Sequence, residues 1–463
     1  MGHGKAAWRS ILCALSAGGL LAAGGARAQV DLWDAATHFQ YNIEKVGVAP
    51  LPTTPASYSI KVVFSVTDPR IGDQPWDIKN AAAFQSAGAQ LTLDIGWDPA
   101  SDFKNTGSNR GTLTPLTALG DAAAMPVRVT GLTSRTLTSA TPCTPADCGA
   151  TDLNRYFATA TVTPLPFGSS VNAGRVALEG HPVCNGIAGF DCPPAAAPPA
   201  APYLNVPARS AAVNFTLEPT QPLEAIIPDP RRLVVDISKC KTCHDGKDHG
   251  TGVVPRLSLH GANRNENLHV CVICHNPNQT DVAYRRATTA TEDPRISAAE
   301  VPIDFKVMVH SIHSGGFRTQ PYVVIGRNSS VNDSSGVRFP RELRNCTNCH
   351  VDANGKGTFE LPLLAGALGT TIKTQSSYLS TPRSIDVDPA NDLKISPIAA
   401  VCSSCHDKQE VKSHMVGTGG ASFATTQAAI GTTVIERCAN CHGPGKKKDV
   451  RRAHEIGGGG GDD

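Results

Sequence analysis

The sequence predicts two dissimilar domains behind a short leader: an N-terminal all-β domain of Greek-key barrel or sandwich type, then a loop-rich, mostly α-helical domain. Three observations support this fold class. Apolar and polar residues alternate in short segments through residues 29–230, the alternation fades after residue 230, and fifteen cysteines are unevenly distributed. A length of 463 residues suits two or three domains. Aromatic residues make up only 5% of the chain, so something else must fill part of its interior.

Residues 1–28 have the pattern of a secretory signal peptide. Lys5 and Arg9 precede an apolar run from Ile11 to Ala23, and Ala26-Arg27-Ala28 supplies a cleavage site of small residues. The run is shorter than the roughly 20 apolar residues of a membrane-spanning helix. No lipobox surrounds Cys13. We therefore expect an exported mature chain without a transmembrane segment, in a compartment that permits disulfide bonds.

The expected β-domain covers residues 29–230. Its clearest strand patterns are Tyr58–Val66, Gln90–Trp97, Pro126–Leu132, Arg155–Pro164 and Ala211–Leu217. Several short strands separated by turn residues favour a sandwich or split barrel. Residues 193–202 are rich in Pro and Ala, which predicts an extended loop or linker. We expect His38 and His181 to be ordinary surface histidines.

Four cysteines in this region predict disulfides. Cys143, Cys148, Cys184 and Cys192 allow three pairings. The local pairs Cys143–Cys148 and Cys184–Cys192 require the least chain closure, so we favour them. Their expected role is structural, and a redox-switching disulfide is the alternative.

All cysteines after residue 230 belong to five C-x-x-C-H motifs, which run from Cys240, Cys271, Cys346, Cys402 and Cys438. This spacing is the attachment pattern of c-type heme, because two cysteines three residues apart can form thioethers and the next histidine can ligate iron. The cofactor prediction is five covalently bound heme c groups. The attachment residues would be Cys240, Cys243, Cys271, Cys274, Cys346, Cys349, Cys402, Cys405, Cys438 and Cys441, and the iron ligands His244, His275, His350, His406 and His442.

Zinc is the alternative occupant of C-x-x-C units. Zinc ribbons pair two such units around one ion and need no histidine after each unit, and five units cannot be paired off. We therefore predict a pentaheme c-type cytochrome domain over residues 231–455, followed by a disordered tail over residues 456–463. Its compact radius of gyration would be about 17 Å, so five hemes must lie close together. They would also replace the missing aromatic core.

Seven further histidines could supply the second axial ligand of each iron: His249, His260, His269, His310, His313, His414 and His454. Methionine ligation has only Met308 and Met415 available in this region, so low-potential bis-histidine iron is expected. The stretch Val301–Ser314 has helical apolar spacing and stops at two glycines. His310 and His313 lie on one face of that predicted helix and could serve two adjacent hemes.

Residues 231–455 resemble the outer-membrane multiheme cytochromes of dissimilatory metal reducers, the OmcA/MtrC family. The matching segments are Cys240–His244 with His260–Arg264 and Cys271–Pro277, then Phe305–Ser314, His414–Met415, and Cys438–Gly445 followed by His454. The resemblance implies His260, His310, His313, His414 and His454 as the distal ligands. His249 and His269 are then extra, either near heme propionates or displacing one member of the set. Family members usually carry ten hemes, so this chain looks like half of the usual molecule.

The function that the resemblance implies is electron transfer. The partners would be other periplasmic or outer-membrane cytochromes, and beyond them metal oxides or soluble electron shuttles. The expected location is the periplasm, the outer-membrane surface or the exterior. Lys and Arg number 42 against 40 Asp and Glu, a balance that gives no support for nucleic-acid binding.

Two alternatives stand beside the electron carrier. A multiheme reductase of nitrite or a sulfur oxyanion would need one open iron. Pentaheme nitrite reductases use a motif that ends in lysine at the catalytic heme, whereas all five motifs here end in histidine. A structural or adhesive β-protein would not need five ligand pairs. We therefore name no catalytic residue and expect a carrier rather than an enzyme with its own substrate.

Overall fold

The computed structural model describes most of the chain between residues 31 and 454. The described ranges are 31–52, 57–99, 103, 105, 125–133, 140–145, 154–162, 172–192, 203–217, 225–231, 234–285, 288–351, 372–375, 378–380, 383–385, 391–430 and 435–454. The expected leader 1–28, the loop 193–202, Cys148 and the tail 456–463 lie outside these ranges.

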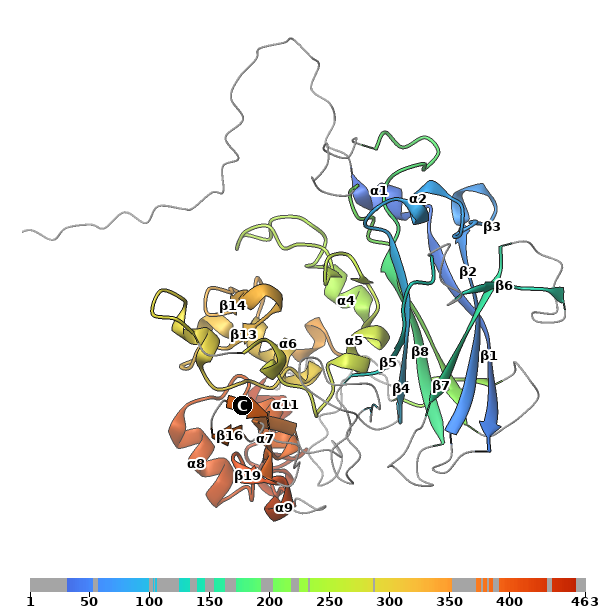
Figure 1. The fold of residues 1–463 in the computed structure, drawn as a ribbon. Coiled ribbons are helices and arrows are strands. Elements are labelled where there is room, and N and C mark those ends of the chain that lie inside the picture. The colour runs from blue at the N-terminus through green and yellow to red at the C-terminus, as the bar shows by residue number, and fades with distance from the viewer. Residues whose placement is uncertain are drawn as a thin grey trace, which may run out of the picture.

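Two antiparallel sheets of five strands form the N-terminal part (Figure 1). The first sheet has the order β1 (Gln40–Leu51), β2 (Ser57–Asp68), β7 (Tyr156–Val162), β6 (Thr141–Pro142), with β3 (Gln74–Pro75) on β2. The second has the order β10 (Ile226–Ile227), β9 (Ala211–Thr216), β8 (Ala173–His181), β4 (Gln90–Trp97), β5 (Val127–Val129). Among the described strands, the sheets do not close into a barrel. Of the two expected forms, barrel and sandwich, the structure therefore shows the sandwich. Short helices α1 (Leu32–Ala36) and α2 (Ala82–Gln85) lie at one end.

The sandwich core follows the period-two pattern of the sequence. On β2, Ile60, Val62, Phe64 and Val66 are all buried in one apolar cluster, which also takes in residues of β4. Because side chains two residues apart share a face of a strand, alternation predicted β2, β4, β5, β7 and β9. Strand β8 was missed, since every one of its residues is buried and no alternation remains. The long strand β1 was missed as well.

His38 and His181 are buried, so the expectation of surface histidines was wrong. His38 is 6% exposed and His181 is 2% exposed. The Nδ1 atom of His38 lies 2.8 Å from Asp68 Oδ2, and Gln90 Nε2 lies 3.1 Å from the Nε2 of His181. Such partners allow polar rings to sit in an interior. In the same part, the predicted disulfide Cys184–Cys192 is confirmed.

Burial of His181 makes a pH-dependent contribution to stability. Burial lowers the pKa of His181 to about 4, below the 6.5 of an unfolded histidine. As the pH falls, this histidine is therefore protonated in the unfolded chain at a higher pH than in the folded chain. The free energy of unfolding consequently decreases below pH 6.5. Between pH 7.5 and 5 we expect a loss of about 2 kcal/mol from this group. The variant His181→Gln should lack that part of the loss in denaturant titrations, and equal pH slopes for the two proteins would contradict this prediction.

The C-terminal part consists of short helices and long loops. Its helices are α4 (Ile237–Lys241), α5 (Leu268–Cys274), α6 (Phe305–His313), α7 (Pro397–Cys402), α8 (Gln409–Gly417), α9 (Gln427–Ile430), α10 (Ala439–His442) and α11 (Val450–Ala453). Its strands are β11 (Ser258–Leu259), β12 (Arg264–Asn265), β13 (Val323–Ile325), β14 (Val331–Asp333), β15 (Ile372–Gln375), β16 (Tyr378–Ser380), β17 (Arg383–Ile385), β18 (Leu393–Ile395) and β19 (Thr425–Thr426). No described helix is long and apolar enough to span a bilayer.

Helix α5 packs against the outer face of the second sheet, beside β4 and β8 (Figure 1). Val270 and Ile273 of the helix join Phe103 and Ala177 in a small buried cluster. The Asn267 side chain donates a hydrogen bond of 2.8 Å to the carbonyl of Ser210. This contact covers the second face of β8 and explains why that strand is buried throughout.

Charged side chains are also buried at this contact. Arg175 is 1% exposed and donates two hydrogen bonds of 2.8 Å to Asp229. Arg264, from the C-terminal part, pairs at 2.6 Å with Glu179 of β8, and Arg128 also pairs with Glu179. Buried carboxylates need such partners because an unpaired buried charge is costly. The two parts therefore meet through specific polar contacts as well as apolar packing.

Candidate heme-binding site

Each of the five motifs folds into one helical turn. In every motif the histidine amide donates a hydrogen bond of 2.9 Å to the carbonyl of the first cysteine. The donor and acceptor pairs are His244 and Cys240, His275 and Cys271, His350 and Cys346, His406 and Cys402, and His442 and Cys438. One turn brings both cysteines and the histidine to the same short stretch of surface. None of the ten motif cysteines is paired in a disulfide, so both sulfurs of each motif can serve in thioethers.

Local sequence signals place these turns. Asp236 caps α4, Asn267 caps α5 and Asn345 caps the 3-10 turn Cys346–Asn348, each through its side-chain oxygen. Asp and Asn are favoured at such positions because they satisfy an amide that has no helical partner. The capping residue lies one to four positions before the first cysteine of its motif. The three N-terminal motifs therefore begin on capped turns.

Each motif histidine faces a second histidine. The separations between ring centres are 6.1 Å for His244 and His313, 6.0 Å for His275 and His260, 5.9 Å for His350 and His310, 6.0 Å for His406 and His454, and 6.2 Å for His442 and His414. Two imidazoles on opposite sides of one metal ion, with metal–nitrogen bonds of about 2.0 Å, have ring centres about 6 Å apart. The five pairs therefore fit the space of a bis-histidine iron.

The second nitrogen of several of these rings is held by the backbone. Among the motif histidines, Nδ1 of His244 lies 2.9 Å from the carbonyl of Pro255, and Nδ1 of His275 lies 2.9 Å from that of Ile303. Among the facing histidines, the same bond joins His310 to Lys306, His313 to Val309 and His454 to Val450. A carbonyl acceptor fixes the proton on Nδ1 and leaves Nε2 free for a metal.

Burial keeps several of these rings neutral. Burial lowers the pKa of His275, His310, His313 and His406 below the usual value. A neutral imidazole is the form that binds a metal. The electrostatics of the pairs thus agree with their geometry.

Helix α6 begins against the second motif. Asp304 caps it through the amides of Lys306 and Val307. The carbonyl just before this cap belongs to Ile303 and accepts from the His275 ring, and the amide of Phe305 donates to the His275 carbonyl at 3.0 Å. The sequence predicted a helix from Val301, and the observed helix starts four residues later at this cap.

The other end of α6 lies against the fourth motif. Ser314, which follows the helix, donates a hydrogen bond of 2.8 Å to the carbonyl of Ser404. The Asp407 carboxylate accepts from the amides of Thr319 and Gln320 at 3.0 and 2.7 Å. With its own histidines facing the first and third motifs, α6 and its flanks contact four motifs.

The remaining contacts place the motifs in order. Lys239 of the first motif region donates at 2.7 Å to the carbonyl of Thr347 in the third, and Lys241 pairs at 2.7 Å with Glu266 just before the second. These contacts place the first motif between the second and the third.

Glu436 joins the fourth motif to the fifth. Its carboxylate is 5% exposed and accepts bonds of 2.8 Å from the amides of Ile398 and Ala399 and from the Ser396 hydroxyl. It thus caps α7, which leads to the fourth motif, while lying two residues before Cys438. The sequence analysis missed this role, because the acceptor and its donors are about forty residues apart.

We expect Glu436→Ala to lower the free energy of unfolding by about 3 kcal/mol, since a buried charged acceptor of three hydrogen bonds is lost. Chemical denaturation of the heme-loaded protein measures this. Glu410→Ala, at an exposed position of α8, is the control and should change stability by less than about 0.5 kcal/mol. Equal effects of the two substitutions would show that the α7 cap does not hold the C-terminal motifs.

His249 and His269 face carboxylates instead of a motif histidine. His249 Nε2 lies 2.9 Å from Asp245, and His269 Nδ1 lies 3.0 Å from Asp229. Asp229 also accepts hydrogen bonds from the buried Arg175. The structure therefore places both rings apart from the five facing pairs.

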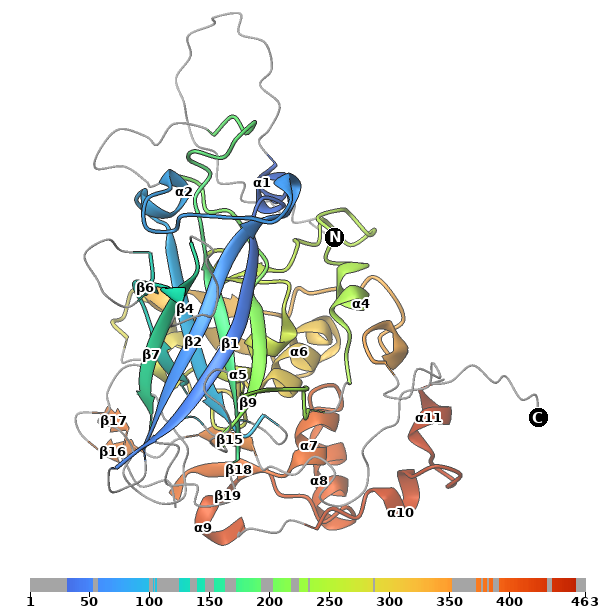
Figure 2. The same ribbon diagram turned by 90° about the vertical axis from the view of Figure 1, so that its right-hand side faces the viewer.

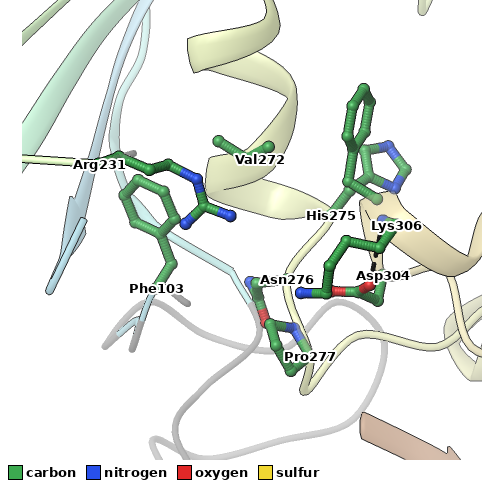
Figure 3. Close-up of a pocket in the computed structure, with 9 residues that line it drawn as sticks. Phe103, Arg231, Val272, His275, Asn276, Pro277, Asp304 and Lys306 are labelled. Atoms are coloured by element: carbon green, nitrogen blue, oxygen red, sulfur yellow. Dashed lines mark hydrogen bonds and ion pairs between the residues drawn. The ribbon is translucent and has the colours of Figure 1, made fainter. Parts of the chain in front are cut away.

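A small pocket lies beside His275, at the boundary of the two parts (Figure 3). Phe103 and Arg231 line one side, and Asp304 and Lys306 line another, where they are paired at 3.4 Å. Among the described residues, no group of three or more His, Cys, Asp or Glu side chains could hold a bare metal ion. The pocket lies where the second motif meets the sandwich.

Residues 232–455 match a family model described as outer membrane cytochrome MtrC/MtrF-like, domains II/IV. The crystal structure of MtrC from Shewanella baltica OS185 is similar at 15% identity over 88% of this chain and 52% of that chain, with a TM-score of 0.46. This chain thus spans about half of that one, and a likeness at this level carries no argument about function. A search of curated proteins found no match. The five-motif part, residues 232–455, belongs to the family of MtrC/MtrF-like outer membrane cytochromes.

Proposed function

We propose that the protein is a pentaheme c-type cytochrome that conducts electrons through five bis-histidine hemes. The observation that carries the proposal is the set of five facing histidine pairs, one for each motif. Heme c, when bound, supplies a reversible one-electron iron couple. The motif cysteines would attach it, the motif histidines would be proximal ligands, and the distal ligands would be His260, His310, His313, His414 and His454.

The paired geometry supports a carrier over a reductase. A reductase needs one iron with an open position for its substrate, and each of the five motif histidines instead has an imidazole opposite it. Backbone carbonyls bind Nδ1 of three of these imidazoles, those of His310, His313 and His454, and keep them oriented. The chain would therefore hold both axial positions and exclude water and substrate from the metal.

The contacts between motifs support a linear order of transfer. The second motif lies against the sandwich, and the first, third and fourth follow around α6. The fifth is joined to the fourth through Glu436 and through the crossed pairs His406–His454 and His442–His414. Electrons would thus pass between the sandwich end and the fifth-motif end of the C-terminal part.

We infer the cellular setting from the family. Residues 29–230 would form the β-domain and residues 231–455 the heme domain of an exported protein at the outer-membrane surface or in the periplasm. Its partners would be other cytochromes of the cell envelope, and its ultimate acceptors metal oxides or soluble electron shuttles. The family name itself refers to outer membrane cytochromes.

Electron paramagnetic resonance of the oxidised protein tests the proposal, with heme quantified on the same sample. We expect five hemes per chain, all low-spin ferric. A stoichiometric high-spin signal would instead mean an open iron, and nitrite and sulfur oxyanions would then be tried as substrates. Fewer than five hemes would overturn the assignment of five equivalent sites.

A further inference from the structure

Within residues 435–454, which contain the fifth motif, the exposed charged side chains are all positive. Residues 435–454 contain six bases against two acids, a net charge of four, whereas the whole chain carries only +2. The two acids, Glu436 and Asp449, are buried at 5% and 8% exposure. Asp449 accepts from the amides of Gly445 and Arg451 at 2.7 and 2.9 Å. Both carboxylates are thus engaged in holding the backbone.

Five of the bases form what we call the basic surface: Arg437, Lys446, Lys447, Lys448 and Arg452. All five are exposed. No ion pair joins any of them to a carboxylate in the part of the chain that the structure describes. They are therefore available to an anionic partner.

The basic surface belongs to the fifth motif itself. The carbonyl of Lys448 accepts from Nδ1 of His442 at 3.0 Å, so the lysine run holds the motif histidine in place. Helices α10 and α11, which flank the run, lie at the lower right of Figure 2, away from the strands of the sandwich. The opposite end of the motif order is covered by the sandwich.

We propose that the basic surface is the docking site of an acidic redox protein that exchanges single electrons with the fifth heme. This inference rests on the proposed function. In the reducing direction, one electron leaves the partner's reduced centre and converts one ferric heme to ferrous.

The distribution of charge favours a protein partner. The five cations extend over sixteen residues of helix and loop, which suits an extended acidic face better than one small anion. The rest of the chain has a net charge of −2, because this segment has a net charge of +4 and the total is +2. This asymmetry would orient an acidic partner toward the fifth motif during its approach.

The test uses the full heme-loaded chain and a plant-type [2Fe–2S] ferredoxin as the acidic probe. The variant carries Lys446→Gln, Lys447→Gln and Lys448→Gln. Stopped-flow mixing with reduced ferredoxin should show a second-order rate about tenfold lower at low ionic strength, with convergence at high salt. Calorimetry with oxidised ferredoxin should show the Kd raised by a similar factor.

A matched control removes three exposed cations elsewhere, through Arg209→Gln, Lys247→Gln and Arg341→Gln, and should stay within twofold of the parent. Equal effects of the two triple variants would overturn the proposal, as would a difference that persists at high salt. An equal slowing with anthraquinone disulfonate would also overturn it, because the surface would then attract small anions generally. Electron paramagnetic resonance of the same samples separates these outcomes from failure of the proposed function, which would give a high-spin signal or fewer than five hemes.

Discussion

Replacing His310 or His313 with alanine is expected to convert one of the five hemes to a high-spin form. Each ring faces a different motif histidine, His350 at 5.9 Å and His244 at 6.1 Å. Alanine leaves no side chain that can reach the metal, so water or nothing would take the sixth position. Electron paramagnetic resonance of each variant should show one high-spin heme, and the double variant should show two.

The control for these variants is His269→Ala. That ring faces Asp229, and its loss should leave all hemes low-spin. If His310→Ala and His313→Ala also keep wholly low-spin spectra, then neither histidine is an axial ligand. The pairing seen in the structure would then have a different cause.

Synthesis of the chain without heme attachment is expected to leave the C-terminal part unfolded. In the described segments of that part, the larger apolar cluster contains five buried residues, three of them alanine. Ordering one residue costs about 1–2 kcal/mol, whereas a fully buried large apolar side chain returns about 1.5–3 kcal/mol. So few residues cannot order more than two hundred. The hemes must supply the missing interior, as metals do in small metal-dependent domains.

A host that lacks the heme-attachment machinery provides the measurement. Circular dichroism should lose the helical signal, and limited proteolysis should leave a fragment that contains the sandwich, whose core includes Ile60, Phe64 and Trp97. The heme-loaded chain should resist the same protease. Native-like helical content and resistance without heme would contradict this prediction.

The sequence predicted strands wherever one face of a strand meets the core and the other meets solvent. Segment Gln90–Trp97 was predicted with the bounds that β4 has. Strand β8 escaped because α5 covers its outer face, and that contact comes from a segment about ninety residues later in the chain. His181 was misjudged because its partner, Gln90, lies about ninety residues earlier in the chain. A local sequence pattern indicates only the exposure that neighbouring residues create. It therefore mispredicts strands and side chains that distant segments of the chain bury.

The candidate site was predictable to the extent that it depends on motif spacing. The five C-x-x-C-H units need only five neighbouring residues each, and the resemblance implied the facing histidines as a set. The partner of each histidine could not be found, because His454 faces His406 from forty-eight positions away. The capping role of Glu436 could not be predicted either, because the amides of Ile398 and Ala399 that it accepts from are about forty residues away in the sequence. The roles of these residues as ligands stay predictions until spectra are recorded.

The crossed pairs of the last two motifs interlock their segments. Helix α8 follows the fourth motif and lends His414 to the fifth, while α11 follows the fifth and lends His454 to the fourth. Neither segment can detach without vacating a position at the other motif. Amide hydrogens in α8 and α11 should therefore exchange with solvent as one cooperative unit, although both helices are short and exposed. Fraying near residue 454 would therefore first disturb the heme that we propose at the fourth motif, which is not at the end of the proposed transfer order.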